Sequence, residues 1–347
     1  MDGRDLLIKL SEASAVSGDE SKIHGILNDY FSQVADKTET GNIGNFVAFK
    51  KGSSKKCLKV MIAAHADEIG LMVKDIDKRG FIHFTTVGGV DLKTLPAQEV
   101  IIHGKKEIFG VIGAKPPHVL SKEDRKKAIK MEDMTIDTGL TPDDVNKYIS
   151  IGDFITIKRK CANLLGDYIT GKAIDNRASI AAMYSAAKYL KNQDTLADVY
   201  YVATSMEEIG AMGAATATYD INPDLGIAID VTFGDKYVSE EMRERCGDGI
   251  EIAIGPNMHP EFTKKLIDIA DKNKIPYFLV AYSGCTGTDA WDMQTVREGI
   301  PMLLISIPIK FMHTSTEVVD YKDVERAGRL MSLFISGFKG WEGIYDD

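Results

Sequence analysis

The chain has 347 residues, of which 44% are hydrophobic, enough for one large folded domain and a smaller one. Its formal net charge of −9 argues against nucleic acid or an anionic membrane as the main partner, because both attract basic surfaces. The longest apolar run, residues 300–309, is interrupted by two prolines and is shorter than the roughly 18 residues of a membrane span.

The cysteines are scattered along the chain, at Cys57, Cys161, Cys246 and Cys285. None belongs to a Cys-x-x-Cys pair, and this usage is typical of reduced thiols inside a cell. The first residues have neither the basic segment nor the long apolar stretch of a secretion signal. The sequence therefore predicts a cytoplasmic protein that does not associate with membranes.

Two helices are predicted near the N-terminus. Leu6, Leu7 and Leu10 mark a short amphipathic helix. Residues 17–20 have the sequence of a capping box, which predicts that a second helix begins there and continues through the apolar residues of 23–34. The apolar face of this helix is expected to pack on a sheet.

Two strands follow, over residues 45–50 and 58–64. The second is apolar enough to be buried on both faces, and it runs directly into His65-Ala66-Asp67. Side chains two residues apart on an extended chain point the same way, so Asp67 can accept a hydrogen bond from the His65 imidazole and fix its tautomer. This partner acid favours His65 as a metal ligand.

Between Gly70 and about Asn163 the helical pattern gives way to short strands and turns, which is typical of a small β-barrel or sandwich. Thr141 and Pro142 begin one short helix within this region. We therefore predict an inserted domain at residues 70–163 and a main domain formed by residues 1–69 and 164–347. The ends of the inserted domain should lie close together.

From residue 164 onward, predicted strands and helices alternate, which indicates an α/β fold with a mixed central sheet flanked by helices. Strands are expected at 199–203, 225–229, 277–281 and 301–307, and helices at 178–190, 211–217, 260–270 and 289–298. Asp320 is expected to cap a final amphipathic helix.

Acids and histidines follow several of these strands. Glu207 and Glu208 come after strand 199–203, Asp230 follows 225–229, and His313 lies beyond 301–307. Ligands of open α/β sheets bind beyond the carboxyl ends of the strands, so these side chains should meet there. Two adjacent acids favour a division of roles, in which one binds a metal and the other accepts a proton from metal-bound water.

Asp175 stands where a loop enters the helix at 178–190, a position that also suits an ordinary helix cap. Together with it, the sequence offers a set of nitrogen and oxygen ligands without cysteine: His65, Asp175, Glu208, Asp230 and His313. If one carboxylate bridges, the set can hold two divalent metal ions. Zn²⁺, Co²⁺ or Mn²⁺ suits it better than Ca²⁺, which rarely binds imidazole.

The order of motifs along the whole chain resembles the tetrahedral, dodecamer-forming aminopeptidases with dinuclear metal centres, whose members include glutamyl and deblocking aminopeptidases and some endoglucanases. The motifs span residues 65–70, 110–118, 171–177, 207–210, 228–231 and 312–314. The resemblance implies a zinc-peptidase-like main domain and a PDZ-like inserted barrel that dimerises the chain. It also implies that the dimers assemble into a homododecamer acting on peptides.

The resemblance also assigns a role to each site residue. Asp175 would bridge the metals, with His65 and Asp230 completing one site and Glu208 and His313 the other. Asp67 would orient His65. The expected reaction is attack of a water shared by the metals on the scissile peptide carbonyl, with Glu207 as general base and then acid.

The segment from Gly284 to Asp289 resembles the substrate-pocket segment of that family, but Cys285 departs from the usual glycine-rich form. A helix cap at Thr288 or Asp289 is the competing interpretation. The preferred N-terminal residue and the native metal stay open.

Three other functions compete with the aminopeptidase hypothesis. A metal-dependent carboxypeptidase or deacylase could use the same scaffold. A glycosidase would need two carboxylates that face a sugar ring, but neither histidines nor a metal. A binding module without catalysis is disfavoured because the predicted ligands and the base Glu207 are all present.

Overall fold

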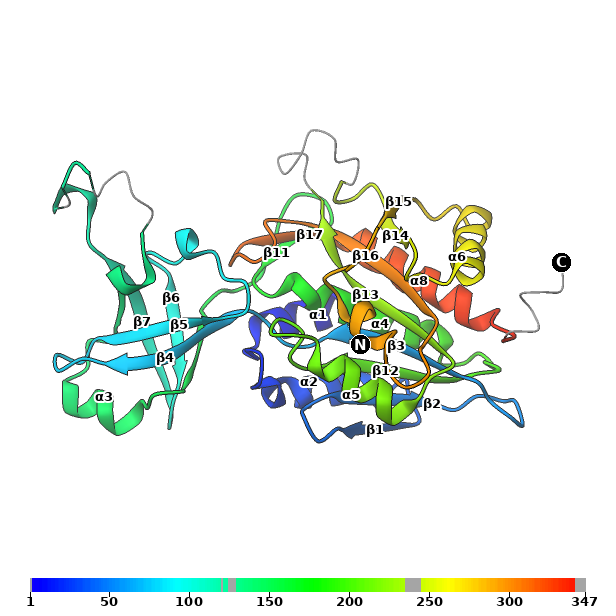
Figure 1. The fold of residues 1–347 in the computed structure, drawn as a ribbon, viewed down its shortest axis with the longest axis horizontal. Coiled ribbons are helices and arrows are strands. Elements are labelled where there is room, and N and C mark those ends of the chain that lie inside the picture. Colours follow the sequence, from blue (N-terminus) through cyan, green and yellow to red (C-terminus); the bar gives the residue numbers. More distant parts are fainter. Residues whose placement is uncertain (1, 120, 124–128, 235–244, 341–347) are drawn as a thin grey trace.

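The protein is represented by a computed structural model, which describes residues 2–119, 121–123, 129–234 and 245–340. A large sheet flanked by helices forms one lobe, and a small β-barrel forms a second lobe beside it (Figure 1). This arrangement confirms the predicted fold class. Within the described residues, no helix is both long enough and apolar enough to cross a membrane.

The sheet has the order β1-β2-β12-β3-β13-β16-β17-β11-β10, and β14 and β15 branch from β16. Its strands are β1 (Lys37–Thr40), β2 (Phe46–Lys50), β3 (Lys59–His65), β10 (Ala162–Asn163), β11 (Tyr168–Gly171), β12 (Asp198–Thr204), β13 (Leu225–Phe233), β14 (Ile250–Ile254), β15 (Tyr277–Ala281), β16 (Met302–Lys310) and β17 (Glu317–Asp320). The central strands β12, β3, β13 and β16 are mutually parallel, so their carboxyl ends meet at one edge of the lobe.

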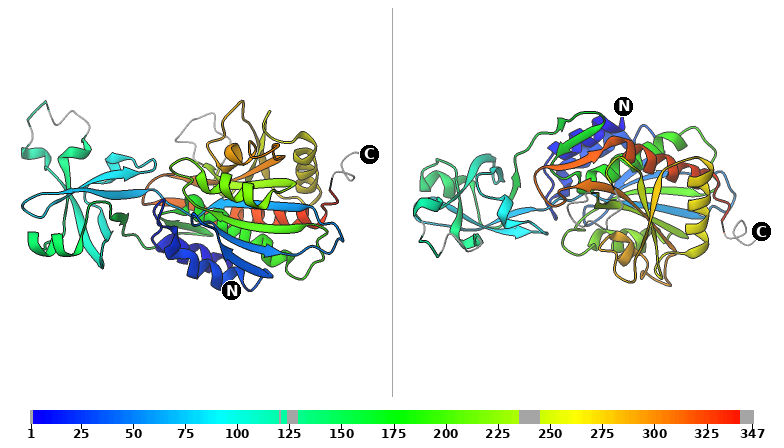
Figure 2. Two further views of the ribbon diagram at one scale, coloured as in Figure 1. Left: turned by 60° about the horizontal axis from the view of Figure 1, so that its bottom comes forward. Right: turned by 90° about the horizontal axis from the view of Figure 1, so that it is seen from above.

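Helices cover both faces of this sheet (Figure 2). They are α1 (Gly3–Glu12), α2 (His24–Phe31), α4 (Ile174–Leu190), α5 (Met212–Ile221), α6 (Pro260–Lys272), α7 (Asp289–Met293) and α8 (Tyr321–Ser336). Ile62 of β3 packs in a core with α1, α4 and α8, whereas Met61 and Ala63 pack in a second core with α5 and α7. Burial on both faces explains why β3 is apolar from Val60 to Ala64, as the sequence predicts.

The barrel closes in the order β4-β5-β8-β7-β6-β9 and has its own apolar core. Its strands are β4 (Gly70–Ile76), β5 (Ile82–Val87), β6 (Glu99–His103), β7 (Glu107–Ala114), β8 (Met134–Asp137) and β9 (Phe154–Ile157). The helix α3 (Pro142–Tyr148) begins as predicted, because Thr141 accepts a hydrogen bond from the Asp144 N–H and Pro142 takes the first helical position. The short 3-10 turns lie at Glu20–Ile23, Leu92–Thr94, Pro117–Val119 and Met131–Asp133.

The predicted capping box at residues 17–20 is wrong, because both of its polar side chains bind elsewhere. The Ser17 hydroxyl donates to Asp67. The Glu20 carboxylate accepts from the Gly18 N–H at 2.8 Å and from the Met206 N–H at 2.9 Å. The chain therefore passes through a 3-10 turn before α2 begins at His24.

Several element boundaries also differ from the predictions, and two of them lie beside the cleft. Strand β13 does not end before Asp230, because its pairing with β16 continues as far as Phe233 and Ile309. Helix α7 ends at Met293 rather than at Glu298. Arg297 has φ 54° and Gly299 has φ 97°, values that a right-handed helix cannot contain.

A buried ion pair anchors the part of the main lobe from which the chain enters the barrel. The Lys172 ammonium lies 2.8 and 2.7 Å from the two carboxylate oxygens of Glu68 and donates to the Ala13 carbonyl at 2.8 Å. Glu68 also accepts from the Ala15 N–H at 3.0 Å. Both charged side chains are buried, so either one left alone would be an uncompensated charge.

We expect Lys172→Met to lower the free energy of unfolding by about 3–5 kcal/mol, because it leaves the Glu68 carboxylate buried without its partner. The matched control is Lys158→Met, which breaks an exposed pair with Glu99 at 3.2 Å and should cost about 0–1 kcal/mol. Urea denaturation of both variants at one protein concentration measures the difference. Equal losses would contradict a stabilising role for the buried pair.

Candidate metal centre

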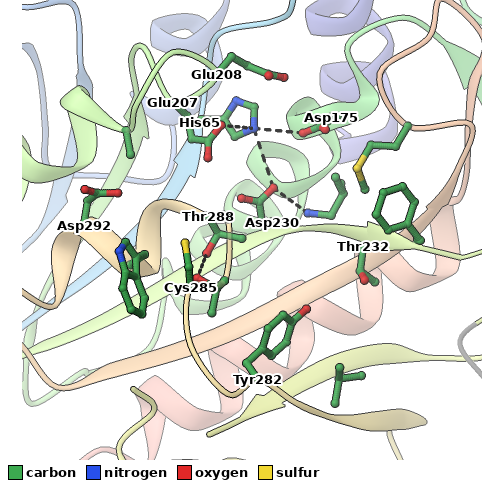
Figure 3. Close-up of a pocket in the computed structure, with 18 of the residues that line it drawn as sticks. His65, Asp175, Glu207, Glu208, Asp230, Thr232, Tyr282, Cys285, Thr288 and Asp292 are labelled. Atoms are coloured by element: carbon green, nitrogen blue, oxygen red, sulfur yellow. Dashed lines mark hydrogen bonds and ion pairs between the residues drawn. The ribbon is translucent and has the colours of Figure 1, made fainter. Parts of the chain in front are cut away.

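The predicted site residues converge at the carboxyl ends of the parallel strands (Figure 3). His65 ends β3 and lies in register with Thr204, the last residue of β12. Glu207 and Glu208 follow in the loop after β12, and Asp230 lies near the end of β13. The adjacency of β12, β3 and β13 therefore brings these four side chains to one cleft.

Asp175 occupies the entry of α4, but it does not cap the helix. Ala173 has φ 53°, Asp175 and Asn176 have non-helical backbone angles, and the bond between them is cis. The Asp175 carboxylate instead points into the cleft, where one oxygen lies 3.1 Å from His65 Nε2 and the other 3.3 Å from His313 Nε2. A single carboxylate thus stands between the two imidazoles.

Two groups of ligand atoms share this carboxylate. His65, Asp175 and Asp230 form one group, and Asp175, Glu208 and His313 form the other. Within each group all ligand atoms lie within 4.8 Å of one another. The first group is buried, whereas Glu208 and His313 of the second are half-buried. The nitrogen and oxygen donors and their convergence fit two divalent cations with Asp175 between them.

The electrostatics of the cleft also fit bound cations. Burial, reinforced by neighbouring carboxylates, raises the pKa of Glu207 to about 8 and that of Glu208 to about 7. Burial also raises the pKa of Asp230 well above its usual range. Although burial opposes it, hydrogen bonds from His313 and His65 lower the pKa of Asp175. No lysine or arginine lines this cleft in the described part of the chain, and divalent cations would supply positive charge beside these acids.

Asp67 supports the site through more contacts than the sequence suggests. Its side chain is fully buried and accepts from the Glu207 N–H at 3.0 Å and from the Glu208 N–H at 3.1 Å, as well as from Ser17. His65 Nδ1 lies 3.5 Å from the Asp67 carboxylate but 3.2 Å from the Asp67 carbonyl oxygen. The backbone carbonyl is therefore the nearer acceptor for the imidazole, and the carboxylate holds the loop that carries both glutamates.

Sequence reasoning missed Glu317, a buried acid in β17. One of its oxygens accepts from the Asp175 N–H at 3.0 Å and the other from the His313 N–H at 2.8 Å. Glu317 thereby ties together two chain segments that carry ligands. In the sequence, Glu317 is only an acid that precedes the apolar pair Val318-Val319. That pattern does not predict which residues Glu317 contacts. His313 is fixed further by its Nδ1, which lies 3.1 Å from the Gly89 carbonyl.

The cleft has a volume of about 1380 Å³ and extends from the candidate metal ligands to β15 and α7. Cys285, Thr286 and Thr288 line it, which places the predicted pocket segment beside these candidate ligands. Thr288 precedes α7 but its side chain makes no capping hydrogen bond. The Asp289 carboxylate accepts from the Thr204 hydroxyl at 2.6 Å and so ties α7 to the end of β12.

A model of the M42 glutamyl aminopeptidase family matches residues 44–330. The chain belongs to this family. It is 36% identical to a putative aminopeptidase of Acetivibrio thermocellus, and this match covers 94% of this chain and 96% of the relative. It is 34% identical to a lysyl aminopeptidase of Pyrococcus furiosus, and that match covers 96% of this chain and 97% of the relative. A solved TET1 peptidase of Pyrococcus horikoshii, which can assemble into a tetrahedron or a large octahedral shell, matches with a TM-score of 0.85 at 26% identity, covering 97% of this chain and 100% of that one.

Family membership confirms the predicted metal-dependent aminopeptidase and hydrolase activity, and it sets aside the glycosidase. The geometry agrees, since both histidines contact Asp175 in the cleft, whereas a glycosidase needs carboxylates but no histidine.

If Asp175 is shared by two cations, Asp175→Asn should reduce the metal content from two ions per chain to well below one, because a single neutral amide replaces the bridging charge. Elemental analysis after dialysis against low-micromolar Zn²⁺ measures this. Asp194→Asn, at an exposed position outside the cleft, is the control and should keep both ions. Two tightly bound ions in Asp175→Asn would contradict the sharing.

Proposed function

We propose that the chain removes N-terminal residues from peptides, with Glu207 as the group that accepts and then returns a proton. The observation that carries this proposal is the position of Glu207 in the cleft. Its carboxylate lies 3.9 Å from His65 Nε2, yet it belongs to neither group of converging ligand atoms. Glu208, its neighbour in sequence, belongs to one of them.

We propose that His65, Asp230 and Asp175 hold one divalent ion and that Glu208, His313 and Asp175 hold the other. The mixed imidazole and carboxylate donors favour Zn²⁺ or Co²⁺, with Mn²⁺ as a further candidate. When bound, two such ions activate a water molecule and polarise the peptide carbonyl. Asp67 positions both glutamates through their backbone N–H groups.

Glu207 is half-buried at the cleft wall, where burial and the neighbouring acids raise its pKa to about 8, and bound cations would lower that pKa again. A carboxylate whose pKa lies near the working pH can accept a proton from water and return it to the leaving amine. This proton transfer is the only chemical step that we assign to a side chain of the protein.

The charge of the cleft favours recognition of the N-terminus over the C-terminus of a peptide. A carboxypeptidase needs a basic side chain for the terminal carboxylate, and none lines the cleft among the described residues. A free α-ammonium group, in contrast, is attracted by the acids that line the cleft, which include Asp292 at its rim. The same argument disfavours a deacylase, because an acylated amine carries no charge.

We propose that residues 70–163 form an inserted domain that dimerises the chain, and that the dimers form a tetrahedral homododecamer. Two apolar side chains of the barrel strand β7 support this, since Phe109 and Val111 are 46% and 41% exposed. The assembly of the related TET1 peptidase into a tetrahedron supports the same symmetry. A cytoplasmic location is also part of the proposal and rests on the four free cysteines.

Glu207→Gln should lower kcat on an aminoacyl-p-nitroanilide by about 10²–10⁴-fold, because the amide cannot accept the proton. Its metal content should remain that of the wild type. Glu261→Gln, an exposed change on α6, is the control and should retain wild-type kcat. A kcat of Glu207→Gln within tenfold of the wild type would show that another group is the base.

Light scattering at micromolar concentration should give the mass of a dodecamer. The double change Phe109→Glu and Val111→Glu should shift the mass to smaller species, because charges replace an apolar contact surface. Leu196→Glu alters an equally exposed apolar side chain of the main lobe and should leave the mass unchanged. A wild-type mass near that of one chain would rule out the proposed assembly.

A further inference from the structure

The strand β15 (Tyr277–Ala281) lies at an edge of the main sheet. It pairs in parallel with β14, and within the described part of the chain it pairs with no other strand. All of its residues are apolar or aromatic, and they include neither proline nor a charged side chain. Natural proteins normally protect such an edge, because its unpaired backbone groups accept another strand.

The pairing with β14 determines which backbone groups are free. The Ile250 N–H donates to the Pro276 carbonyl at 3.2 Å, and the Tyr282 N–H donates to the Ile254 carbonyl at 2.8 Å. In a parallel ladder, alternate residues of a strand face the same neighbour, so the even-numbered residues of β15 face β14. The backbone groups of Tyr277, Leu279 and Ala281 therefore point away from the sheet.

This free edge borders the catalytic cleft. Every residue from Tyr277 to Tyr282 lines the same cavity as His65 and Glu207, and Figure 3 shows Tyr282 of this run. A cavity above one face of a sheet would touch alternate residues only, so this unbroken run means that the cavity reaches the edge of β15. Leu279 is 50% exposed there.

The register of the strands places the edge relative to the metal ligands. Asp230 pairs with Ser306, Ser306 with Glu251, and Glu251 with Phe278. Phe278 thus lies level with Asp230 across three strand spacings, which is roughly 14 Å. An extended peptide covers that distance in about four residues. A peptide held at the metal centre by its N-terminus can therefore reach β15 with the residues that follow.

We propose that the free edge of β15 binds the main chain of the substrate peptide, beyond the scissile bond, as an added strand. This inference rests on the proposed aminopeptidase function and adds its ligand class, an extended peptide longer than about five residues. Main-chain hydrogen bonds recognise any sequence, so they add affinity without restricting which residues follow the first. A second copy of this chain is the competing occupant of the edge, but the continuity of the edge with the catalytic cleft favours the substrate.

The test uses initial rates of N-terminal leucine release from alanine peptides of two to eight residues. The ratio kcat/KM should rise about tenfold between three and seven residues, as expected for two or three added hydrogen bonds. Single N-methylation along the octapeptide should then lower kcat/KM at alternate positions beyond about the fourth residue, because only alternate amides of an added strand face β15. A rate independent of length, or equal effects at neighbouring positions, would overturn the proposal.

The protein side is tested with Leu279→Pro, which removes a free-edge N–H at a position where a sheet tolerates proline. The rise in kcat/KM between three and seven residues, called the length gain, should be about three- to tenfold smaller in Leu279→Pro. It should persist in Leu279→Ala, which keeps the N–H. Equal loss in both would assign the effect to the side chain and overturn the proposal. So would a change of oligomeric mass in Leu279→Pro with an intact length gain, since the edge would then pair with another copy.

Leucine-p-nitroanilide separates this inference from the function on which it rests. It has no main chain beyond the scissile bond, so it cannot reach β15. If the wild type hydrolyses neither it nor the p-nitroanilides of lysine and glutamate, the proposed function fails. If the wild type hydrolyses it but shows neither the length gain nor the alternating pattern, only the role of β15 is wrong. Should Leu279→Pro fail to fold, the N-methylated peptides still decide.

Discussion

The buried carboxylate of Asp175 between two imidazoles is the interaction on which the rest of the site depends. His65 comes from the end of β3 and His313 from the segment after β16, and each approaches a different oxygen of Asp175 within 3.3 Å. Glu207, Glu208 and Asp230 crowd around them at a cleft that no described lysine or arginine lines. Burial raises the pKa values of these three acids, and the two proposed cations would supply the positive charge that favours their ionised forms.

A set of buried carboxylates holds the loops of the cleft in place by accepting backbone N–H groups. Asp67 fixes the Glu207-Glu208 loop, Glu20 accepts from Met206 just before it, and Glu317 joins the segments of Asp175 and His313. These acids stand close to the centre but bind the protein rather than the substrate. They position the ligands within a scaffold whose long cleft ends at the free edge of β15, and this links the chemistry at the centre to the proposed binding of extended peptides.

The sequence predicted the fold class, and it predicted that the candidate site residues would meet at one cleft, because both depend on local patterns. An apolar run followed by an acid or a histidine marks a buried strand and its carboxyl end, as at His65 and Glu207. The sequence could not predict contacts between distant segments. Ser17 and Glu20 have a helix-capping spacing, yet they bind Asp67 and Met206. The hydrogen bond from the Asp175 N–H to Glu317 could not be predicted from the residues around Glu317. The free edge of β15 depends on the strand order, which propensity does not encode.

The central claim, that Asp175 lies between two metal ions, is tested most directly by anomalous X-ray scattering from crystals of the Zn²⁺-loaded enzyme. The account predicts two anomalous peaks per chain, about 3.5–4 Å apart, one beside His65 and Asp230 and the other beside Glu208 and His313. The Asp175 carboxylate should lie between them. A single peak, or a second peak that does not contact Asp175, would contradict the account.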